Sequence, residues 1–291
     1  MADERNFRSA YYEKVGFRSV EEKKSLEILL KEKPLDRGKL RQFCVRFSVP
    51  ATYRNLVWKL LLGVIPVHID SHNFIMDQRK QEYHELHRAL TVMRVIDTNT
   101  PKPQVFLAMW LLQTGNFTID TSLATERGFS NIVQSFMQFF EDDADVFWLS
   151  RNFYENVKKF DSDLGKLVEK SYMILEKEDA AYYKHLNKTG VLDNLPLAKW
   201  FDCCFAGILY KSALERIWDK LCGGSYKILA FVAVVVLTTL KARIMKCNNI
   251  SAVLQIIKNI TEETADVIAN KSIEMWQQYG TPLTVHDKPK P

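Results

Sequence analysis

Apolar residues recur at helical spacing along almost the whole chain of 291 residues. One such set follows the spacing i, i+3, i+4, i+7, which places its members on one helical face: Val57, Leu60, Leu61 and Val64. The same spacing returns in three later segments: 133–140, 214–221 and 253–260. Sustained alternation with a period of two residues, bounded by the Asn-Gly or Asp-Gly turns of hairpins, does not occur in the sequence. The pattern predicts an all-α fold with short connections and no significant sheet.

The longest apolar run, residues 228–237, is compatible with a strand or a helix because its centre is rich in valine. The stretch 228–245 continues for eighteen residues without glycine or proline, and this length favours a buried helix. Gly223 and Gly224 predict a helix end and a turn just before it. At ten residues, the apolar run is too short to span a bilayer, so it is expected in the core.

Two features in the middle of the chain predict local structure. Residues 115–130 contain two glycines, several threonines and serines, and little apolar periodicity, which predicts a surface loop. The acidic segment after Glu141 predicts the start of a helix at Asp142 or Asp143, because carboxylates suit the positive end of the helix dipole.

Composition excludes several classes of protein. The hydrophobic fraction is 47% and the net charge is +5, which together exclude disordered, collagen-like and coiled-coil chains. No run of five like charges occurs, which argues against nucleic-acid binding. The first residues carry no apolar signal region, and the five cysteines include no CxxC pair. We therefore expect reduced thiols and a cytoplasmic protein.

Motifs for catalysis, metals or cofactors are weak. His84 and His87 could share a helical face, but no further ligands are signalled, so solvated histidines are expected. Cys204 lies in an apolar, helix-like segment that favours a buried thiol over a nucleophile. The segment 223–227 lacks the spacing of a phosphate-binding loop. No cofactor or metal is expected.

Three segments carry motifs in a fixed order. Residues 53–63 are YRNLVWKLLLG, residues 141–148 are EDDADVFW, and residues 200–219 contain W-F-x-x-x-F followed by R-I-W-D. Together they resemble the TBC domain, the all-helical fold of proteins that activate Rab-type GTPases. The resemblance implies a two-lobed helical fold. The signature residues that carry it are Arg54, Trp58, Asp145, Trp148, Trp200, Arg216, Trp218 and Asp219.

These signature residues also have structural roles that follow from their chemistry. The tryptophans are large apolar anchors for helix packing. Arg54 and Asp219 are expected to make buried or half-buried polar contacts that hold helix ends in place. The motifs therefore predict the fold, and they confer no activity by themselves.

The resemblance also implies a division of the chain. Residues 1–49 are expected to form an N-terminal helical extension that packs on the domain, and residues 50–240 the TBC domain itself. Residues 241–279 would add C-terminal helices that complete the domain, and residues 280–291 would form a flexible tail.

Activity in this family depends on an arginine in an IxxDxxRT segment and a glutamine in a YxQG segment, both supplied to the bound GTPase. The corresponding stretch here, residues 93–100, is MRVIDTNT. Aligned on Thr100, the arginine position holds Asn99; aligned on Asp97, it holds Thr100. The glutamine position falls on Arg127, and YxQG does not occur in the sequence. The resemblance thus implies a pseudo-GAP without catalytic residues.

The segment 5–30 and the short chain resemble one subgroup of this family more closely, the small third subunit of the hamartin–tuberin complex. This implies a non-catalytic subunit that binds the hamartin coiled coil and, through it, tuberin. Tuberin then supplies the GAP activity toward Rheb that restrains TOR complex 1, and the complex can be recruited to lysosomal or vesicle surfaces.

Two alternative functions stay open. The chain could be a GTPase-activating protein for a Rab-family GTPase that uses Arg127 or Arg94 as a substitute finger. It could also be a GTPase effector that binds without stimulating hydrolysis, with Asn99 and Thr100 lining the groove.

Overall fold

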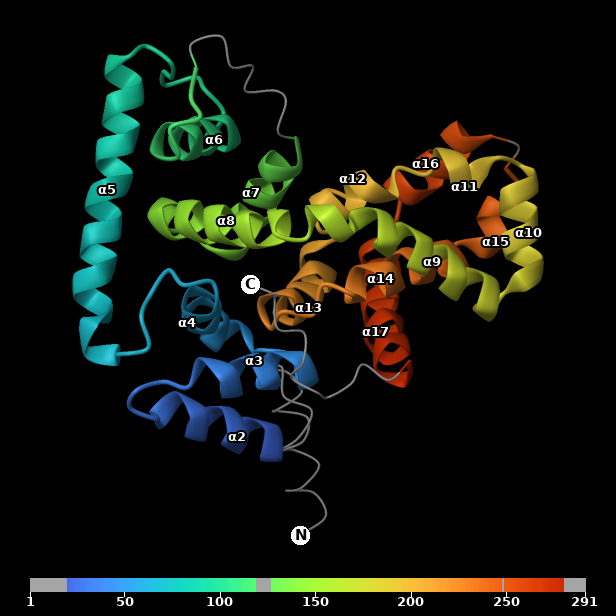
Figure 1. The fold of residues 1–291 in the computed structure, drawn as a ribbon, viewed down its shortest axis with the longest axis horizontal. Coiled ribbons are helices and arrows are strands. Elements are labelled where there is room, and N and C mark those ends of the chain that lie inside the picture. Colours follow the sequence, from blue (N-terminus) through green and yellow to red (C-terminus); the bar gives the residue numbers. More distant parts are fainter. Residues whose placement is uncertain (1–19, 119–126, 248, 280–291) are drawn as a thin grey trace. The chain divides into compact units, whose positions relative to one another are not determined.

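The structure is a computed structural model that describes residues 20–118, 127–247 and 249–279. Every regular element in these ranges is a helix, which confirms the all-α prediction (Figure 1). Contacts divide the chain into two compact units. Unit 1 combines the chain up to Asp161 with Trp218–Ser225, and unit 2 combines Ser162–Ile217 with the chain from Tyr226 onward. The N-terminal segment before residue 20 and the tail 280–291 lie outside the described residues.

Unit 1 is built from the N-terminal helices and the end of one later helix. In chain order these are α2 (Val20–Lys31), α3 (Arg37–Arg46), α4 (Ala51–Leu61), the 3₁₀ turn η1 (Ile69–Ser71), α5 (His72–Val92), α6 (Lys102–Gln113), α7 (Arg127–Phe139), α8 (Asp143–Lys158) and the last residues of α13 (Lys211–Cys222). Two of these helices start directly after a proline, since Pro50 is the N-cap residue of α4 and Pro101 is the N-cap residue of α6.

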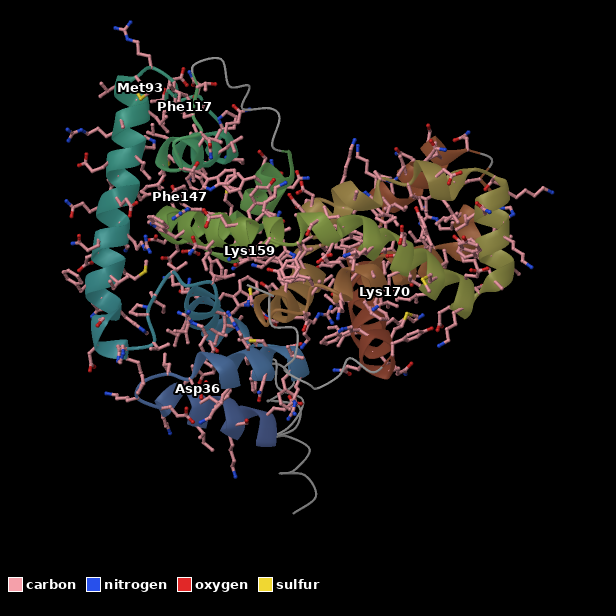
Figure 2. All side chains as sticks on the ribbon, in the orientation of Figure 1. Asp36, Met93, Phe117, Phe147, Lys159 and Lys170 are labelled. Atoms are coloured by element: carbon pink, nitrogen blue, oxygen red, sulfur yellow. The ribbon has the colours of Figure 1, made fainter. Side chains whose placement is uncertain are left out.

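The core of unit 1 is aromatic. Phe147 of α8, labelled in Figure 2, packs against Tyr83 of α5 and Phe106 of α6, with ring centroids 5.9 Å and 5.7 Å away. At the other end of α8, Phe153 stacks on Trp218 with centroids 4.5 Å apart. All of these rings are buried. Burial of such large rings, each favourable by roughly 2–3 kcal/mol, holds these helices together.

The predicted loop over residues 115–130 is partly wrong. Helix α7 begins at Arg127, and Phe129 in its first turn is fully buried. The reason is visible in the spacing: Phe129, Ile132, Val133 and Phe136 follow i, i+3, i+4, i+7, so the apolar face begins earlier than the sequence analysis placed it. Residues 119–126 lie outside the described residues.

Unit 2 contains the remaining helices. In chain order these are the 3₁₀ turn η2 (Asp161–Asp163), which begins at the last residue of unit 1, α9 (Leu164–Glu178), α10 (Ala180–Lys188), α11 (Val191–Asn194), α12 (Leu197–Asp202), the first part of α13, α14 (Ile228–Thr239), α15 (Lys241–Ile244), α16 (Ile250–Lys258) and α17 (Glu262–Gln278). Helix α14 packs against α9 and α17 and forms the centre of the unit.

The long apolar segment is a buried helix, as its length predicted, and the strand alternative is wrong. Every residue from Ile228 to Leu237 is buried. The helix does not continue to Met245, however, because α14 ends at Thr239 and α15 starts after Leu240. The hydroxyl of Thr238 donates to the carbonyl of Val234 at 3.0 Å, a contact that bends helices. Before α14, Gly224 adopts a φ of 94°, which confirms the predicted helix end and turn.

Asp179 caps α10 and pairs with Lys241 of α15. Its Oδ1 accepts the backbone N–H of Tyr182 at 3.0 Å, and its other oxygen pairs with Lys241. The Lys241 contact, followed by the cap bond, lowers the pKa of Asp179 below its ordinary value. A carboxylate with a lowered folded-state pKa stabilises the fold above its unfolded pKa, and this contribution is lost as the pH falls through the folded pKa.

We therefore expect Asp179→Asn to lower the free energy of unfolding at pH 7. The loss should become much smaller once the pH falls below the lowered folded-state pKa of Asp179, which lies under the ordinary value of about 4. Asparagine keeps an acceptor for the cap, so the difference reports the charge. Urea unfolding of both proteins at neutral and acidic pH measures it. Equal losses at both pH values would contradict the assignment.

Candidate functional site

Asp219 is the centre of a buried hydrogen-bond network in unit 1. Its carboxylate Oδ1 accepts from Trp58 Nε1 at 2.9 Å and from Arg54 Nε at 3.3 Å. Its Oδ2 accepts the backbone N–H of Val49 at 2.8 Å, and Arg54 also donates to the Val49 carbonyl at 2.5 Å. Asp219 and Arg54 are both buried. The first and third signature segments therefore meet, and the contacts expected of Arg54 and Asp219 are present.

Burial raises the pKa of the Asp219 carboxyl, while the Arg54 and Lys220 cations and the donated N–H groups oppose the rise. The network connects α4 to the end of α13 and holds both in place. Its role is structural, since Asp219 is fully buried and Arg54 is only 6% exposed.

Lys220 belongs to the same buried region and was missed by the sequence analysis. Its Nζ donates to the carbonyls of Cys44 at 2.9 Å and Phe47 at 2.6 Å, which ties α13 to the end of α3. The residue is only 1% exposed. The sequence feature that could have predicted its burial is its position in the last turn of α13, directly after Asp219 and before the apolar Leu221 and Cys222.

The second signature segment forms the acidic start of α8. Asp142 is the N-cap and accepts the backbone N–H of Asp145 at 2.9 Å, as the sequence predicted for this helix start. Three lysines from three different helices pair with this segment: Lys59 with Asp145 at 2.6 Å, Lys80 with Asp142 at 3.3 Å and Lys102 with Asp143 at 2.8 Å. The carboxylates thus connect α4, α5 and α6 to α8.

Trp148 of the same segment is fully buried and lies against two arginines. The guanidinium carbons of Arg79 and Arg151 are 4.1 Å and 5.2 Å from its ring centroid. Its Nε1 donates to the Arg79 carbonyl at 3.0 Å, so the ring joins α5 to α8. The role is again one of packing.

In unit 2, Trp200 is buried beside Phe205, with ring centroids 6.1 Å apart. Arg216 pairs with Asp266 and donates to Asn270 at 2.6 Å, which joins α13 to α17. The R-I-W-D motif therefore serves both units, because Arg216 makes its contacts in unit 2 and Trp218 and Asp219 make theirs in unit 1.

The residues predicted to be degenerate finger positions, Asn99 and Thr100, lie in the connection between α5 and α6. The Thr100 hydroxyl donates to Asp97 Oδ1 at 2.9 Å and accepts the Asp97 N–H at 2.9 Å, while the Asn99 N–H donates to the same Oδ1. These bonds, the Thr100 hydroxyl first, lower the pKa of Asp97. Instead of a guanidinium, the connection presents a self-capped turn with an ionised carboxylate.

Arg94 is one of the two arginines that could replace the arginine finger. It directly follows Met93, the C-cap residue of α5, and Met93 is labelled in Figure 2. Its φ is 57°, in the left-handed region that favours glycine, and its N–H closes the helix end on the Thr91 carbonyl at 3.0 Å. Arg94 is exposed. An arginine here carries backbone strain that glycine would avoid.

We expect Arg94→Gly to raise the free energy of unfolding by about 0.5–1 kcal/mol. The substitution removes the left-handed backbone penalty of roughly 1–2 kcal/mol, and the conformational entropy that glycine loses on folding offsets part of this gain. Arg94→Ala is the control, since it removes the guanidinium and keeps the strain. Urea unfolding midpoints of both variants measure the effect. A destabilised glycine variant would show that the Arg94 side chain makes a contact that outweighs the strain.

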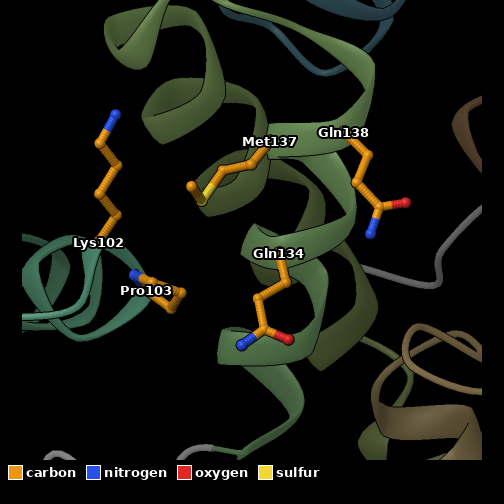
Figure 3. Close-up of a pocket in the computed structure, with 5 residues that line it drawn as sticks. All are labelled: Lys102, Pro103, Gln134, Met137 and Gln138. Atoms are coloured by element: carbon orange, nitrogen blue, oxygen red, sulfur yellow. The ribbon is translucent and has the colours of Figure 1, made fainter.

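The third degenerate position, Arg127, is the first residue of α7, and its side chain lies outside the described residues. Near the degenerate turn, α6 and α7 border an open hollow lined by Lys102, Pro103, Gln134, Met137 and Gln138 (Figure 3). Its single cation, Lys102, is already paired with Asp143. The hollow brings together no set of groups for acid–base or nucleophilic chemistry.

Other site types are also missing from the described chain. No group of three metal-ligating side chains occurs there, and none of the five cysteines forms a disulfide. No helix in the described ranges has both the length and the apolar character needed to cross a membrane.

Comparison with known proteins identifies relatives of the whole chain. The Rab-GTPase-TBC domain matches residues 126–245. TBC1 domain family member 7 of Danio rerio is 44% identical over 291 residues, covering 97% of this chain and 99% of the relative. The human protein of the same name is 41% identical over 285 residues, with 96% and 97% covered.

Solved structures agree on the fold. The Ypt/Rab-GAP domain of Gyp1p superposes with a TM-score of 0.63 at 15% identity, covering 89% of this chain and 99% of that domain. The flagellar RabGAP TBC domain of Chlamydomonas gives a TM-score of 0.57 at 18% identity, with 85% and 88% covered.

Proposed function

Since this chain belongs to the TBC domain family and is similar over nearly its full length to TBC1 domain family member 7, we propose that it is a non-catalytic subunit of the hamartin–tuberin complex. It would bind the hamartin coiled coil in the cytoplasm and stabilise the complex. In this role it supports the GAP activity of tuberin toward Rheb and so the restraint of TOR complex 1.

The observation that carries the proposal is the turn at Asn99 and Thr100. Where the family motif places an arginine, the Thr100 hydroxyl is hydrogen-bonded to Asp97 at 2.9 Å, and Asn99 is exposed without a positive charge. An arginine finger contributes roughly a 10³–10⁵-fold acceleration, and a neutral or anionic side chain cannot supply it. The intact helical core, with Asp219 and its partners in place, supports a binding role for the chain.

Recovery of hamartin from cell lysate tests the proposal. We expect the tagged full-length chain to retain hamartin, and tuberin through it, in near-equal amounts. The matched control is the Ypt/Rab-GAP domain of Gyp1p, which shares the fold at 15% identity and should retain neither. Purified hamartin coiled coil that fails to bind the purified chain would overturn the proposal.

A second function is favoured by the match to the Rab-GTPase-TBC domain over residues 126–245. In this alternative the chain activates a Rab-family GTPase with Arg94 or Arg127 as a substitute finger. Arg94 is exposed and precedes the turn 97–100 in the sequence, and Arg127 follows this turn. Because a displaced arginine loses most of the effect of a finger, we rank this function second.

A further inference from the structure

We propose that Thr100 is a phosphorylation site for a proline-directed protein kinase. Thr100 precedes Pro101 in the connection between α5 and α6, and kinases of this class accept a serine or threonine followed by proline. In the whole sequence only Thr100 and Thr281 have this neighbour. The exposure of the connection and the local character of its hydrogen bonds favour modification there.

The connection is open to a second protein. Asp97, Thr98 and Asn99 are exposed, and Thr100 is half-buried. The bonds that hold the turn are local: the Thr100 N–H donates to the Asp97 carbonyl at 3.2 Å, and the hydroxyl bonds only to Asp97. A kinase that draws the turn into an extended conformation therefore leaves the hydrogen bonds of α5 and α6 intact.

Pro101 already has an extended backbone, with φ −57° and ψ 135°, and the N–H groups of Gln104 and Val105 donate to its carbonyl. Proline also disfavours the helical conformation at Thr100. Pro101, directly after the phosphate acceptor, is thus already extended, and only the turn before Thr100 has to open in a kinase groove.

The transfer itself needs a nucleoside triphosphate bound to the kinase. The Thr100 Oγ1 attacks the γ-phosphorus, so an O–P bond forms while the bond between that phosphorus and the β–γ bridging oxygen breaks. The hydroxyl proton passes to the catalytic aspartate of the kinase, and the nucleoside diphosphate leaves. No redox change is involved.

The phosphate would change the charges around the turn. Oγ1 lies 2.9 Å from the Asp97 carboxylate, so a dianion on this oxygen repels it and opens the turn. The phosphate would then lie at the start of α6, which has no side-chain cap and where the helix dipole favours an anion. Lys102 is 53% exposed and pairs with Asp143 at 2.8 Å. Exposed pairs are weak, so the phosphate competes for Lys102 and loosens the tie between α6 and α8.

The test uses the full-length chain carrying Thr281→Val, so that only Thr100 precedes proline. The protein is incubated with a proline-directed kinase and ATP, and the phosphate is located by mass spectrometry of its peptides. We expect a single phosphate on Thr100. Thr100→Val and Pro101→Ala should abolish it, and Thr100→Ser should restore it. Thr98→Val is the matched control in the same turn and should leave incorporation unchanged.

Amide hydrogen exchange gives a second readout. Phosphorylation should speed exchange at the N–H groups of Asp97, Asn99 and Thr100, whose bonds depend on the closed turn. The proposal is overturned if Thr100 stays unmodified in the folded chain while the same kinase modifies a synthetic peptide of residues 95–105. Unchanged incorporation in Thr100→Val would overturn it equally.

Discussion

Single-turnover hydrolysis of GTP by Rheb or by Rab-type GTPases is expected to run at its intrinsic rate when the purified chain is present in excess. A family member with an arginine finger accelerates this step by roughly 10³–10⁵-fold. The two predicted arginine positions hold Asn99 and Thr100, and both residues are hydrogen-bonded to the carboxylate of Asp97. A negative charge in this place opposes the charge that develops on the transferred phosphoryl group.

The Ypt/Rab-GAP domain of Gyp1p with a Rab-type GTPase is the positive control for this measurement. Stimulation of about a hundredfold by the present chain, equivalent to about 2.7 kcal/mol of barrier, would contradict the prediction. Arg94→Gly and Arg127→Ala would then identify the residue responsible. The glycine variant is suited to this purpose because the expected gain in stability removes unfolding as a cause of lost activity.

Asp219→Asn is expected to lower the free energy of unfolding by about 3–5 kcal/mol. The substitution keeps the shape of the side chain but leaves the buried Arg54 guanidinium without its counter-charge, at a site where both residues are buried. Asparagine also has only one acceptor oxygen, so either Trp58 Nε1 or the Val49 N–H loses its acceptor. Urea unfolding followed by tryptophan fluorescence measures the loss.

Asp143→Asn is the matched control for this effect. Asp143 also pairs with a cation, Lys102, but its side chain is 37% exposed, so its loss should cost no more than about 1 kcal/mol. If Asp219→Asn does not fold, Trp58→Phe keeps the ring and removes one donor, with an expected loss of about 1–3 kcal/mol. A loss below about 1 kcal/mol for Asp219→Asn would show that the network contributes little to stability.

Sequence periodicity predicted the helices because helical spacing is a local property. The buried helix after Gly224 and the start of α8 just after its N-cap Asp142 both follow from residues within a few positions of each boundary. The start of α7 was placed too late, although its apolar spacing already begins at Phe129. Phe129 packs on Trp110 and Tyr154, with ring centroids 5.3 Å and 5.4 Å away.

The motifs indicated which residues matter, and the structure decided what each of them does. Arg216 and Asp219 are three positions apart, yet one pairs with Asp266 in unit 2 and the other with Arg54 in unit 1. No local rule separates them, because ion pairs between distant segments depend on how the helices pack.

The sequence by itself determined the all-α class and the family, since these depend on residue type and local spacing. Only the tertiary structure revealed the buried role of Lys220 and the self-capped turn at Thr100. A lysine becomes buried when carbonyls from another helix end, at Cys44 and Phe47, meet its ammonium. A threonine hydroxyl caps a turn only when the backbone brings Asp97 within 2.9 Å of it.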